Sequence, residues 1–451
     1  MKTVYLINRF AAASSISERP GSFRYIVLNE TIDANRIRGL FAKRGSCEEI
    51  DAREVRLNSF TDLRKEFIAF IGRLNASNAS LFWWAYFISN KNPALVPLFY
   101  DVSNFLVIDE LLKKEGDDLV VIADRIEIAG QLKHSANSKS YAIRDMIEVR
   151  RGIADNIDKI LPVSITAKFI RLIWRKILMA LSGYPRKIRT EPGRPYTVIR
   201  TMITENCFSK DGSYRDTYFG DLPVYLERKG RPTLIVAALS GHYGRILKAA
   251  EKSKIRIPII PIESLLTLSQ AVRLFIISFV RFFKSPPIKG ETSLYGADIK
   301  WLLEASMRDN IASSSFFSHA DSYFSTETLM KKTDIARLLY PMENRPWERM
   351  MILSSRVHNP RCRVIGYQHA SIGQKHMNFV ISDAEEPVVP IPDEVIATGQ
   401  AAKEILEGKC NMRRTPVKSG CALRYSAGEG NIRTRPKTVS NILVTLAASL
   451  E

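Results

Sequence analysis

The chain has 451 residues, of which 66 are Lys or Arg and 47 are Asp or Glu, so its net charge is +19. Hydrophobic residues make up 45% and charged residues 25%, a globular composition that excludes a disordered chain, a collagen and a coiled coil over the whole length. The five cysteines are scattered without a C-x-x-C pair, which excludes a disulfide scaffold and suits a reducing compartment.

The first residues, MKTVYLINRF, hold an apolar run of only four residues, Val4 to Ile7. A secretory signal needs about 7–15 apolar residues, so this run predicts a first β-strand instead. Strands are predicted at residues 3–7, 25–28, 119–123, 197–201, 233–237, 257–261, 364–367, 395–398 and 441–445. Helices are predicted at residues 62–74, 141–159, 164–181, 242–253, 263–283, 325–338, 345–355 and 400–407.

The alternation of almost continuously apolar strands with helices predicts an α/β protein built on parallel sheets. The stretch from about residue 138 to 183 is predicted to be a helical insertion between α/β portions. In such folds, ligands bind at the carboxyl ends of the strands. Residues that directly follow predicted strands are therefore the first candidates for a functional site.

Basic charge is concentrated between residues 168 and 200, which hold nine Lys or Arg and one acid. Lys168, Arg171 and Arg175 recur on one face of a predicted helix, with Lys176 beside them. This pattern is typical of a helix lying on an anionic membrane surface, and we expect these four residues to dock the protein there. A basic helix face that is simply solvated is the other interpretation.

The longest apolar stretch, residues 265–283, approaches the length of about 20 residues that spans a bilayer. Gln270, Arg273 and Arg281 interrupt it. The stretch therefore indicates a buried core helix or an interfacial helix rather than a membrane span.

A strong positive charge could also indicate nucleic-acid binding. The sequence, however, has no zinc-finger spacing, no ribonucleoprotein-type aromatic motif and no basic region followed by heptads. A second basic stretch, residues 409–437, is rich in Gly, Ser and Pro and is predicted to be a loop or linker. We expect no nucleic-acid partner.

Several common catalytic motifs are absent from the sequence. There is no G-x-G-x-x-G after a strand, no P-loop, no H-E-x-x-H and no G-x-S-x-G. The sequence therefore lacks the motif that best identifies each of four enzyme classes: dinucleotide oxidoreductases, P-loop ATPases, zinc metalloproteases and α/β-hydrolases. We expect neither a cofactor nor a metal site.

Candidate site residues gather between residues 340 and 400. YPMENRPWERMMI holds Glu343 and Arg345 before a predicted helix, and VIGYQHASI places Gln368 and His369 at a strand end. PDEVIATGQ follows with Thr398 and Gly399 at the end of the next strand. If the two strands pair in parallel, their carboxyl ends are neighbours.

The chemistry of these residues suits proton transfer beside an anion. His369 can accept a proton from a hydroxyl group near neutral pH, and Glu343 can orient that imidazole or act as the base itself. Gly399 permits close approach of the backbone, and a helix N-terminus after it favours a phosphate. The alternatives are a structural histidine, a helix start with a packed Trp347, and a simple Thr-Gly cap.

ENRPWE, IGYQHAS and PDEVIATG, in this order, together with SLFWWAYFISNKNP at residues 80–93, resemble bacterial surface-carbohydrate biosynthesis proteins encoded with O-antigen genes. That family resembles glycosyltransferases with two facing Rossmann-like domains, called GT-B-like. It is also distantly similar to capsule-polymer and teichoic-acid transferases, in which a His-Gly pair takes the place of Gln368-His369. Here Ala370 stands where those proteins have the glycine.

The resemblance implies transfer of a sugar from a nucleotide-sugar donor to a lipid-linked glycan acceptor, in O-antigen, lipopolysaccharide or capsule synthesis. It implies catalytic roles for His369 and Glu343, and substrate-binding roles are expected for Arg345, Gln368, Thr398 and Gly399. The protein is expected to be peripheral on the inner face of the cytoplasmic membrane. The alternative is a non-catalytic or inactive assembly protein of the same pathway.

The resemblance also implies a domain division. Residues 1–436 are expected to form the acceptor-side, N-terminal half of the GT-B-like architecture. Residues 437–451, containing NILVTLAASLE, are expected to be a linker and the first strand of a donor domain. On this interpretation the chain lacks roughly 100–150 residues, about one Rossmann-like domain. Otherwise residues 441–451 add an edge strand to the domain present.

Overall fold

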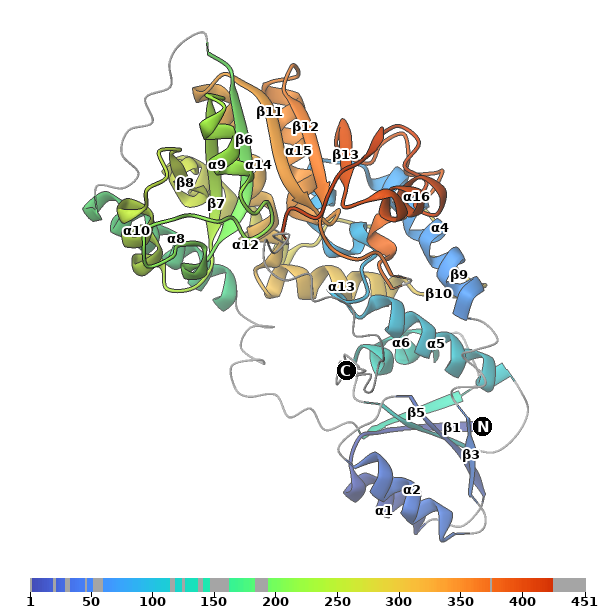
Figure 1. Ribbon diagram of the computed structural model, residues 1–451. Coiled ribbons are helices and arrows are strands. Elements are labelled where there is room, and N and C mark those ends of the chain that lie inside the picture. Colours follow the sequence, from blue (N-terminus) through green and yellow to red (C-terminus); the bar gives the residue numbers. More distant parts are fainter. Residues whose placement is uncertain are drawn as a thin grey trace, which may run out of the picture.

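The computed structural model describes residues 2–18, 22–28, 33–44, 47–51, 60–113, 118–123, 126–136, 141–146, 162–182, 194–373 and 375–424. Within these ranges the chain forms a five-stranded and a seven-stranded parallel sheet, both flanked by helices (Figure 1). The predicted α/β class with Rossmann-like parallel sheets is therefore confirmed. No helix in these ranges combines the length and the apolar character needed to cross a bilayer.

The five-stranded sheet lies at the lower end of the molecule in Figure 1. Its strands are β1 (Lys2–Ile7), β2 (Phe23–Val27), β3 (Cys47–Ile50), β4 (Asp118–Ile122) and β5 (Tyr141–Met146), in the order β3-β2-β4-β1-β5. Alternate side chains of β1 face opposite sides. Tyr5 and Ile7 join the core under α1 (Phe10–Ser17) and α2 (Ala34–Ala42), whereas Val4 and Leu6 join the main core.

The seven-stranded sheet has the order β14-β13-β12-β11-β6-β7-β8, with every neighbouring pair parallel. The strands are β6 (Tyr196–Ile203), β7 (Thr233–Leu239), β8 (Ile259–Pro261), β11 (Ile335–Met342), β12 (Arg363–Gln368), β13 (Glu394–Ala397) and β14 (Val417–Ser419). The chain proceeds outward from β6 in one direction and from β11 in the other. The junction of β6 and β11 is therefore the topological switch point of a doubly wound sheet.

Helices cover this sheet and connect it to the smaller one. They are α8 (Val163–Ser182), α9 (Leu222–Arg228), α10 (Tyr243–Lys252), α11 (Ile262–Leu265), α12 (Leu268–Phe283), α13 (Lys300–Ala312), α14 (Ser315–Lys332), α15 (Pro346–His358) and α16 (Gln400–Gly408). α6 (Ile126–Ala136), which follows β4, packs against α13, as does α5 (Leu98–Lys113). A short hairpin of β9 (Ser293–Leu294) and β10 (Ala297–Asp298) precedes α13.

An early segment of the chain packs on the larger sheet rather than the smaller one. It comprises α4 (Phe60–Asn78) and the 3₁₀ turns η1 (Trp83–Ala85) and η2 (Phe87–Asn90), and both turns contact α15. α4 approaches residue 382 so closely that a Cβ at Gly72 would lie 1.7 Å from Ser382 Oγ. The predicted acceptor-side domain of residues 1–436 thus contains two sheets that share packing elements.

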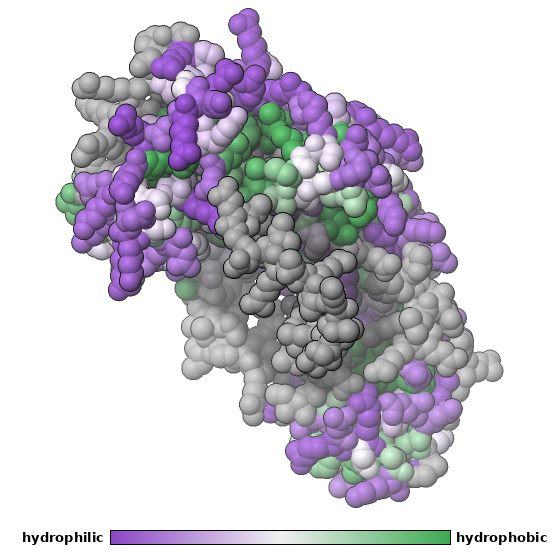
Figure 2. All heavy atoms as spheres, viewed as in Figure 1, coloured by the Kyte–Doolittle hydropathy of each residue, from purple (hydrophilic) through white to green (hydrophobic). Residues whose placement is uncertain are grey.

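Hydrophobic and hydrophilic side chains are distributed unevenly over the surface. Figure 2 shows a mainly hydrophilic exterior, with hydrophobic side chains gathered over the strands of the seven-stranded sheet. There Leu222, Leu226 and Leu339 are only partly buried against Ile199 and Tyr367.

Three predicted elements need correction. Tyr141–Met146 is strand β5 and not a helix, because it completes the sheet by pairing along the whole of β1. The predicted helix 325–338 ends at Lys332, and β11 begins at Ile335 between β6 and β12. The predicted helix 263–283 is divided at Thr267, whose side chain caps α12 by accepting from Gln270 N.

Other predicted elements agree closely with the structure. The strands predicted at residues 3–7, 119–123, 233–237 and 364–367 and the helix predicted at 164–181 are confirmed. The predicted linker and strand at 437–451 lie outside the described residues. Of the predicted insertion at about 138–183, the structure describes residues 141–146 and 162–182, which form β5 and α8.

Candidate active site

A crevice of about 330 Å³ lies at the switch point of the seven-stranded sheet. The carboxyl ends of β6, β7, β11 and β12 reach it, and α8, α11, α14 and α15 supply further walls. In a doubly wound sheet this is where adjacent crossovers run to opposite sides and leave room for a ligand. The location makes the crevice the first candidate for a substrate site.

Three of the residues predicted to be catalytic or substrate-binding line this crevice: Glu343, Arg345 and His369. Glu343 directly follows β11, and His369 directly follows β12, which pairs with β11 in parallel. His369 Nε2 lies 3.2 Å from Glu343 Oε1, and Arg345 forms an ion pair with the other carboxylate oxygen, Oε2. The structure therefore brings together the pair that the sequence analysis picked from two strand ends.

The environment keeps the Glu343 carboxylate charged. Burial alone raises the pKa of Glu343, but the hydrogen bond with His369 and the charge of Arg345 outweigh it, and the net pKa is lowered. The His369 side chain is only 5% exposed: its Nε2 meets Glu343 as an ion pair, and neither ring nitrogen forms a further hydrogen bond among the described residues. A carboxylate that holds one ring nitrogen and leaves the other free is an arrangement suited to proton acceptance.

The turn that carries Glu343 is fixed by a buried carboxyl group. Glu348, in the first turn of α15, accepts hydrogen bonds from Glu343 N at 3.1 Å and Asn344 N at 2.8 Å. Asn344 has a left-handed backbone, with φ of 55°, and its side chain donates to Asn378 O. Asn378 donates in return to Glu343 O. Because these contacts hold the turn from two sides, Glu343 is presented in one orientation.

The other predicted substrate-binding residues, Gln368 at the end of β12 and Thr398 and Gly399 after β13, do not line the crevice. Gln368 is buried, and its Oε1 accepts from both Thr398 N and Thr398 Oγ1 at 3.1 Å. This contact ties the end of β12 to the end of β13. Gly399 precedes α16 with an extended backbone, φ 165°, and open space beside its Cα. The predicted convergence therefore holds for Glu343, Arg345 and His369 only.

Cations that the sequence analysis did not assign to the site also line the crevice. Arg200, on β6, stacks 5.4 Å from the centre of the Trp347 ring, so Trp347 forms part of the wall. Lys168 and Arg175 reach the crevice from α8, and Arg175 pairs with Glu263 at 2.5 Å. A charged residue inside the apolar strand TVIRTMI was the available signal for Arg200.

Acid groups in the crevice are held partly protonated. Burial raises the pKa of Asp321, on α14, to about 7, although the charges of Lys168 and Arg200 oppose the shift. Burial likewise raises the pKa of Glu348 to about 8. Near neutral pH these carboxyl groups cancel less positive charge than two full anions would, so the crevice favours an anionic ligand.

The four residues of α8 predicted to dock on a membrane do not share one exposed face. Lys168 and Arg175 face the crevice, and Lys176 donates hydrogen bonds to the carbonyl groups of Glu263 and Leu266. Only Arg171, of the four predicted docking residues, is exposed. The basic side of the helix turns inward because carboxylates and carbonyl groups of α11 and its flanks receive it.

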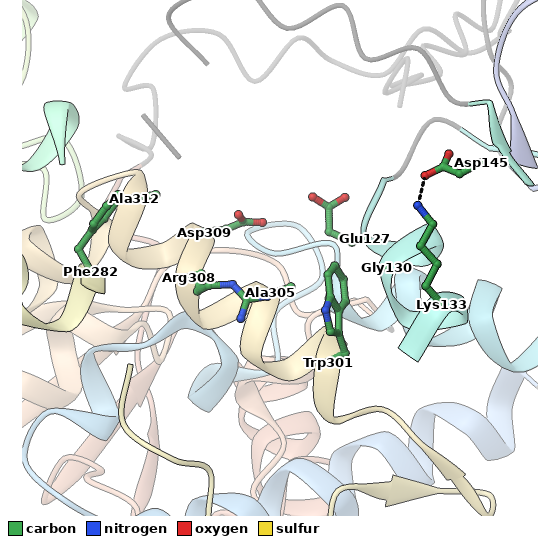
Figure 3. A pocket seen from close by; sticks show the side chains of 10 residues that line it. All are labelled: Glu127, Gly130, Lys133, Asp145, Phe282, Trp301, Ala305, Arg308, Asp309 and Ala312. Carbon is green, nitrogen blue, oxygen red and sulfur yellow. Dashed lines mark hydrogen bonds and ion pairs between the residues drawn. The ribbon is translucent and has the colours of Figure 1, made fainter. Parts of the chain in front are cut away.

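A larger cavity, about 440 Å³, lies between α6 and α13 (Figure 3). Trp301 closes against Gly130, where a Cβ would lie 2.1 Å from the ring, and Arg308 lies 5.6 Å from the centre of the same ring. Lys133 and Asp145 form an ion pair of 2.8 Å at its rim. None of the residues predicted from the sequence lines this cavity, and we rank it second to the crevice.

Two further searches bear on the site. Across the part of the chain that the structure describes, no three His, Cys, Asp or Glu side chains are placed to hold a metal ion. Comparisons with protein-family models, with curated proteins and with solved structures find no match for this chain.

Proposed function

We propose that this protein is a glycosyltransferase of bacterial surface-polysaccharide synthesis, in the O-antigen, lipopolysaccharide or capsule class. The donor is a nucleotide sugar, and the acceptor is a lipid-linked glycan at the cytoplasmic face of the membrane. The observation that carries the proposal is the His369–Glu343 pair in a crevice at the switch point of a parallel sheet. The likeness of the sequence motifs to surface-carbohydrate proteins selects this reaction among those that such a pair can assist.

In the proposed reaction, an acceptor hydroxyl attacks the anomeric carbon of the donor sugar. The new carbon–oxygen bond forms as the bond to the nucleoside diphosphate breaks, and the electron pair leaves with the diphosphate. The hydroxyl proton passes to His369 Nδ1, while Glu343 holds Nε2 and balances the charge of the imidazolium. Arg345 keeps Glu343 ionised through their ion pair.

The leaving diphosphate is matched by the cations of the crevice. Lys168 and Arg200 face Asp321, whose raised pKa leaves their charge less than fully compensated near neutral pH. Arg345 is 41% exposed and can turn toward a phosphate at the mouth of the crevice. Arg side chains suit this role because the guanidinium group can hold two phosphate oxygens at once.

The proposed architecture is GT-B-like, with two Rossmann-like units on either side of the substrates. Two parallel sheets in one chain, joined where α13 packs against α6, support this assignment. The rival function is a non-catalytic, membrane-associated assembly protein of the same pathway. Such a protein binds a lipid-linked glycan but consumes no nucleotide sugar.

A donor screen tests the proposal. The full chain is incubated with a panel of nucleotide sugars and a lipid-linked glycan fraction, and release of nucleoside diphosphate is measured together with the mass of the glycan. We expect one donor to give both products. Binding of no nucleotide sugar and release of no diphosphate, with a chain shown to be folded, would overturn the enzyme and leave the assembly protein.

A further inference from the structure

Large hydrophobic side chains are exposed mainly on two helices. On α8 they are Val163, Ile170, Trp174, Ile177 and Leu181, and on α12 they are Leu268, Val272, Ile276, Phe279, Val280 and Phe283. Only five other large hydrophobic residues are exposed in the described ranges: Tyr100, Tyr225, Tyr295, Val357 and Val388. We call the first set the α8–α12 apolar face.

The face is continuous because the two helices lie side by side. They contact each other directly, and the rings of Phe169 and Phe275 meet at 4.8 Å between centroids. Apart from the neighbours Phe279 and Val280, the exposed residues of each helix recur at intervals of three, four or seven, which places them along one stripe per helix. Trp174 is 57% exposed and Phe283 is 62% exposed, values far from those of core residues.

Four of the six cations of these helices are not exposed, whereas an ordinary surface helix turns its cations to the solvent. On α8, Arg175 and Lys176 are held by Glu263 and nearby carbonyl groups. On α12, Arg281 donates to Tyr86 Oη at 3.0 Å and lies over the Phe316 ring. With most of their cations held against the protein, both helices present their apolar sides to the outside.

The charges around the face indicate which surface it meets. Neither α8 nor α12 contains an Asp or Glu residue. Arg171, Arg273 and Lys284 are exposed on or directly after these helices. An apolar stripe with aromatic residues and cations, and without acids, is the composition of helices that lie in the interface of an anionic membrane.

We propose that the α8–α12 apolar face docks on an anionic lipid bilayer, with its apolar side chains inserted between the acyl chains and the three cations at the headgroups. The sequence analysis expects electrostatic attachment through the basic side of α8; here burial of apolar surface is the main contribution. The opposite side of α8 lines the crevice, so the crevice lies about one helix diameter, roughly 10 Å, from the bilayer. That spacing suits a lipid-linked acceptor, the only point at which this inference rests on the proposed function.

Intrinsic fluorescence provides a site-specific test. The chain has five tryptophans, and Trp174 is the exposed one, since Trp83 and Trp84 are buried and Trp301 and Trp347 are half-buried. Vesicles of phosphatidylcholine with one third phosphatidylglycerol should shift the emission of the full chain to shorter wavelength. Trp174→Phe should bind the vesicles equally in sedimentation but lose the shift. A shift that persists in Trp174→Phe would overturn insertion of α8.

A polar variant tests the face as a whole. Replacing Ile170, Trp174, Ile276 and Val280 by Asn should lower the fraction of protein that sediments with these vesicles by about tenfold or more, because four inserted side chains are lost. Tyr225→Asn with Val357→Asn, exposed hydrophobics on α9 and α15, is the matched control and should bind as the unaltered chain does. Equal loss in the control would contradict the assignment.

The salt dependence of vesicle binding and the particle mass without lipid distinguish a bilayer from other partners of the α8–α12 apolar face. Binding should fall with added salt but remain measurable, because apolar burial is not screened. Complete loss in high salt would mean purely electrostatic attachment and would overturn insertion. A lipid-free dimer that becomes a monomer in the four-residue variant, without vesicle binding by either form, would assign the face to a second copy. Neither measurement depends on sugar transfer, so this inference and the proposed function can fail separately.

Discussion

His369 is the side chain on which the proposed chemistry depends most directly. Replacing it by Ala should lower the turnover number roughly 10²–10⁴-fold, the usual contribution of a general base. The fold should persist, since Nδ1 has no hydrogen-bond partner among the described residues. Turnover and circular dichroism of His369→Ala are compared with those of His134→Ala, a half-exposed histidine on α6. A loss of less than a few-fold would make His369 structural.

Substitution of Glu343 can show whether this residue orients His369 or is itself the general base. Glu343→Gln retains a group that can bond Nε2 but removes the charge that balances the imidazolium. We expect a smaller loss of turnover than in His369→Ala, and in the double variant a loss close to that of His369→Ala alone, because the pair acts as a unit. A larger loss in Glu343→Gln than in His369→Ala would identify Glu343 as the base.

The raised pKa of Asp321 predicts the direction in which the free energy of unfolding changes with pH. Burial raises its pKa from 3.8 to about 7, so between these pH values the folded chain keeps a proton that the unfolded chain has released. Stability therefore falls as pH rises through this window, by about 1.4 kcal/mol per pKa unit. Asp321→Asn removes this cost, so its free energy of unfolding relative to the unaltered chain should increase with pH across the window. Urea unfolding at several pH values measures it, with Asp383→Asn, an exposed position, as control.

The sequence located part of this site because some residues stand next to recognisable elements. Glu343 and Arg345 precede a proline-initiated helix, and His369 follows an uninterrupted apolar strand. Asp321 lies inside a helix with no motif around it, and only packing brings it to Arg200. On α8, helical spacing shows that two faces differ, but it cannot tell which of them the protein body covers.

At the scale of elements, a buried polar network joins two of the four segments on which the sequence resemblance rests. Lys91, from residues 80–93, forms an ion pair with Glu385, and both side chains are at most 1% exposed. Arg349, from the ENRPWER segment, donates to Ser89 O at 2.7 Å and lies over the Trp84 ring. The two segments therefore form one buried contact behind the turn that carries Glu343.

Removing one partner of this network should destabilise the fold strongly. Lys91→Met leaves the Glu385 carboxylate buried without its cation, and we expect a loss of about 3–5 kcal/mol in the free energy of unfolding. The double variant Lys91→Met, Glu385→Leu should recover much of that loss. Lys331→Met, which breaks an exposed pair with Glu327, should cost less than about 1 kcal/mol. Urea unfolding measures all three, and similar values for Lys91→Met and Lys331→Met would contradict a buried pair.

Local sequence patterns predicted an element well where the segment fitted either the strand pattern or the helix pattern and not both. They failed at β11, in which Ile335 and Leu338 continue the apolar spacing of α14, and in which Arg337 and Pro341 disguise a central strand. They failed again at β5, whose YAIRDM sequence becomes a strand because β1 offers a free edge. In both cases pairing with a distant strand overrides local propensity, and a sequence window does not contain that partner.

At the scale of the whole molecule, two cavities are candidate binding sites for the nucleotide-sugar donor. The crevice lies at the switch point of the seven-stranded sheet, and the cavity of Figure 3 lies between α6 and α13, beside the five-stranded sheet. Both are large enough for part of a nucleotide sugar. The cations, the His369–Glu343 pair and the raised pKa of Asp321 occur together only at the crevice.

Hydrogen exchange of the full chain can decide between the two cavities. A nucleoside diphosphate held at the switch point should slow exchange in the segments that follow β6, β11 and β12 and in the first half of α14, because these line the crevice. Exchange in α1 and α2, which cover the far side of the smaller sheet, should stay unchanged. Arg200→Gln should weaken this protection, whereas Arg308→Gln, in the second cavity, should not. Protection centred on α6 and α13, abolished by Arg308→Gln, would move the donor to the cavity of Figure 3 and leave His369 without a substrate.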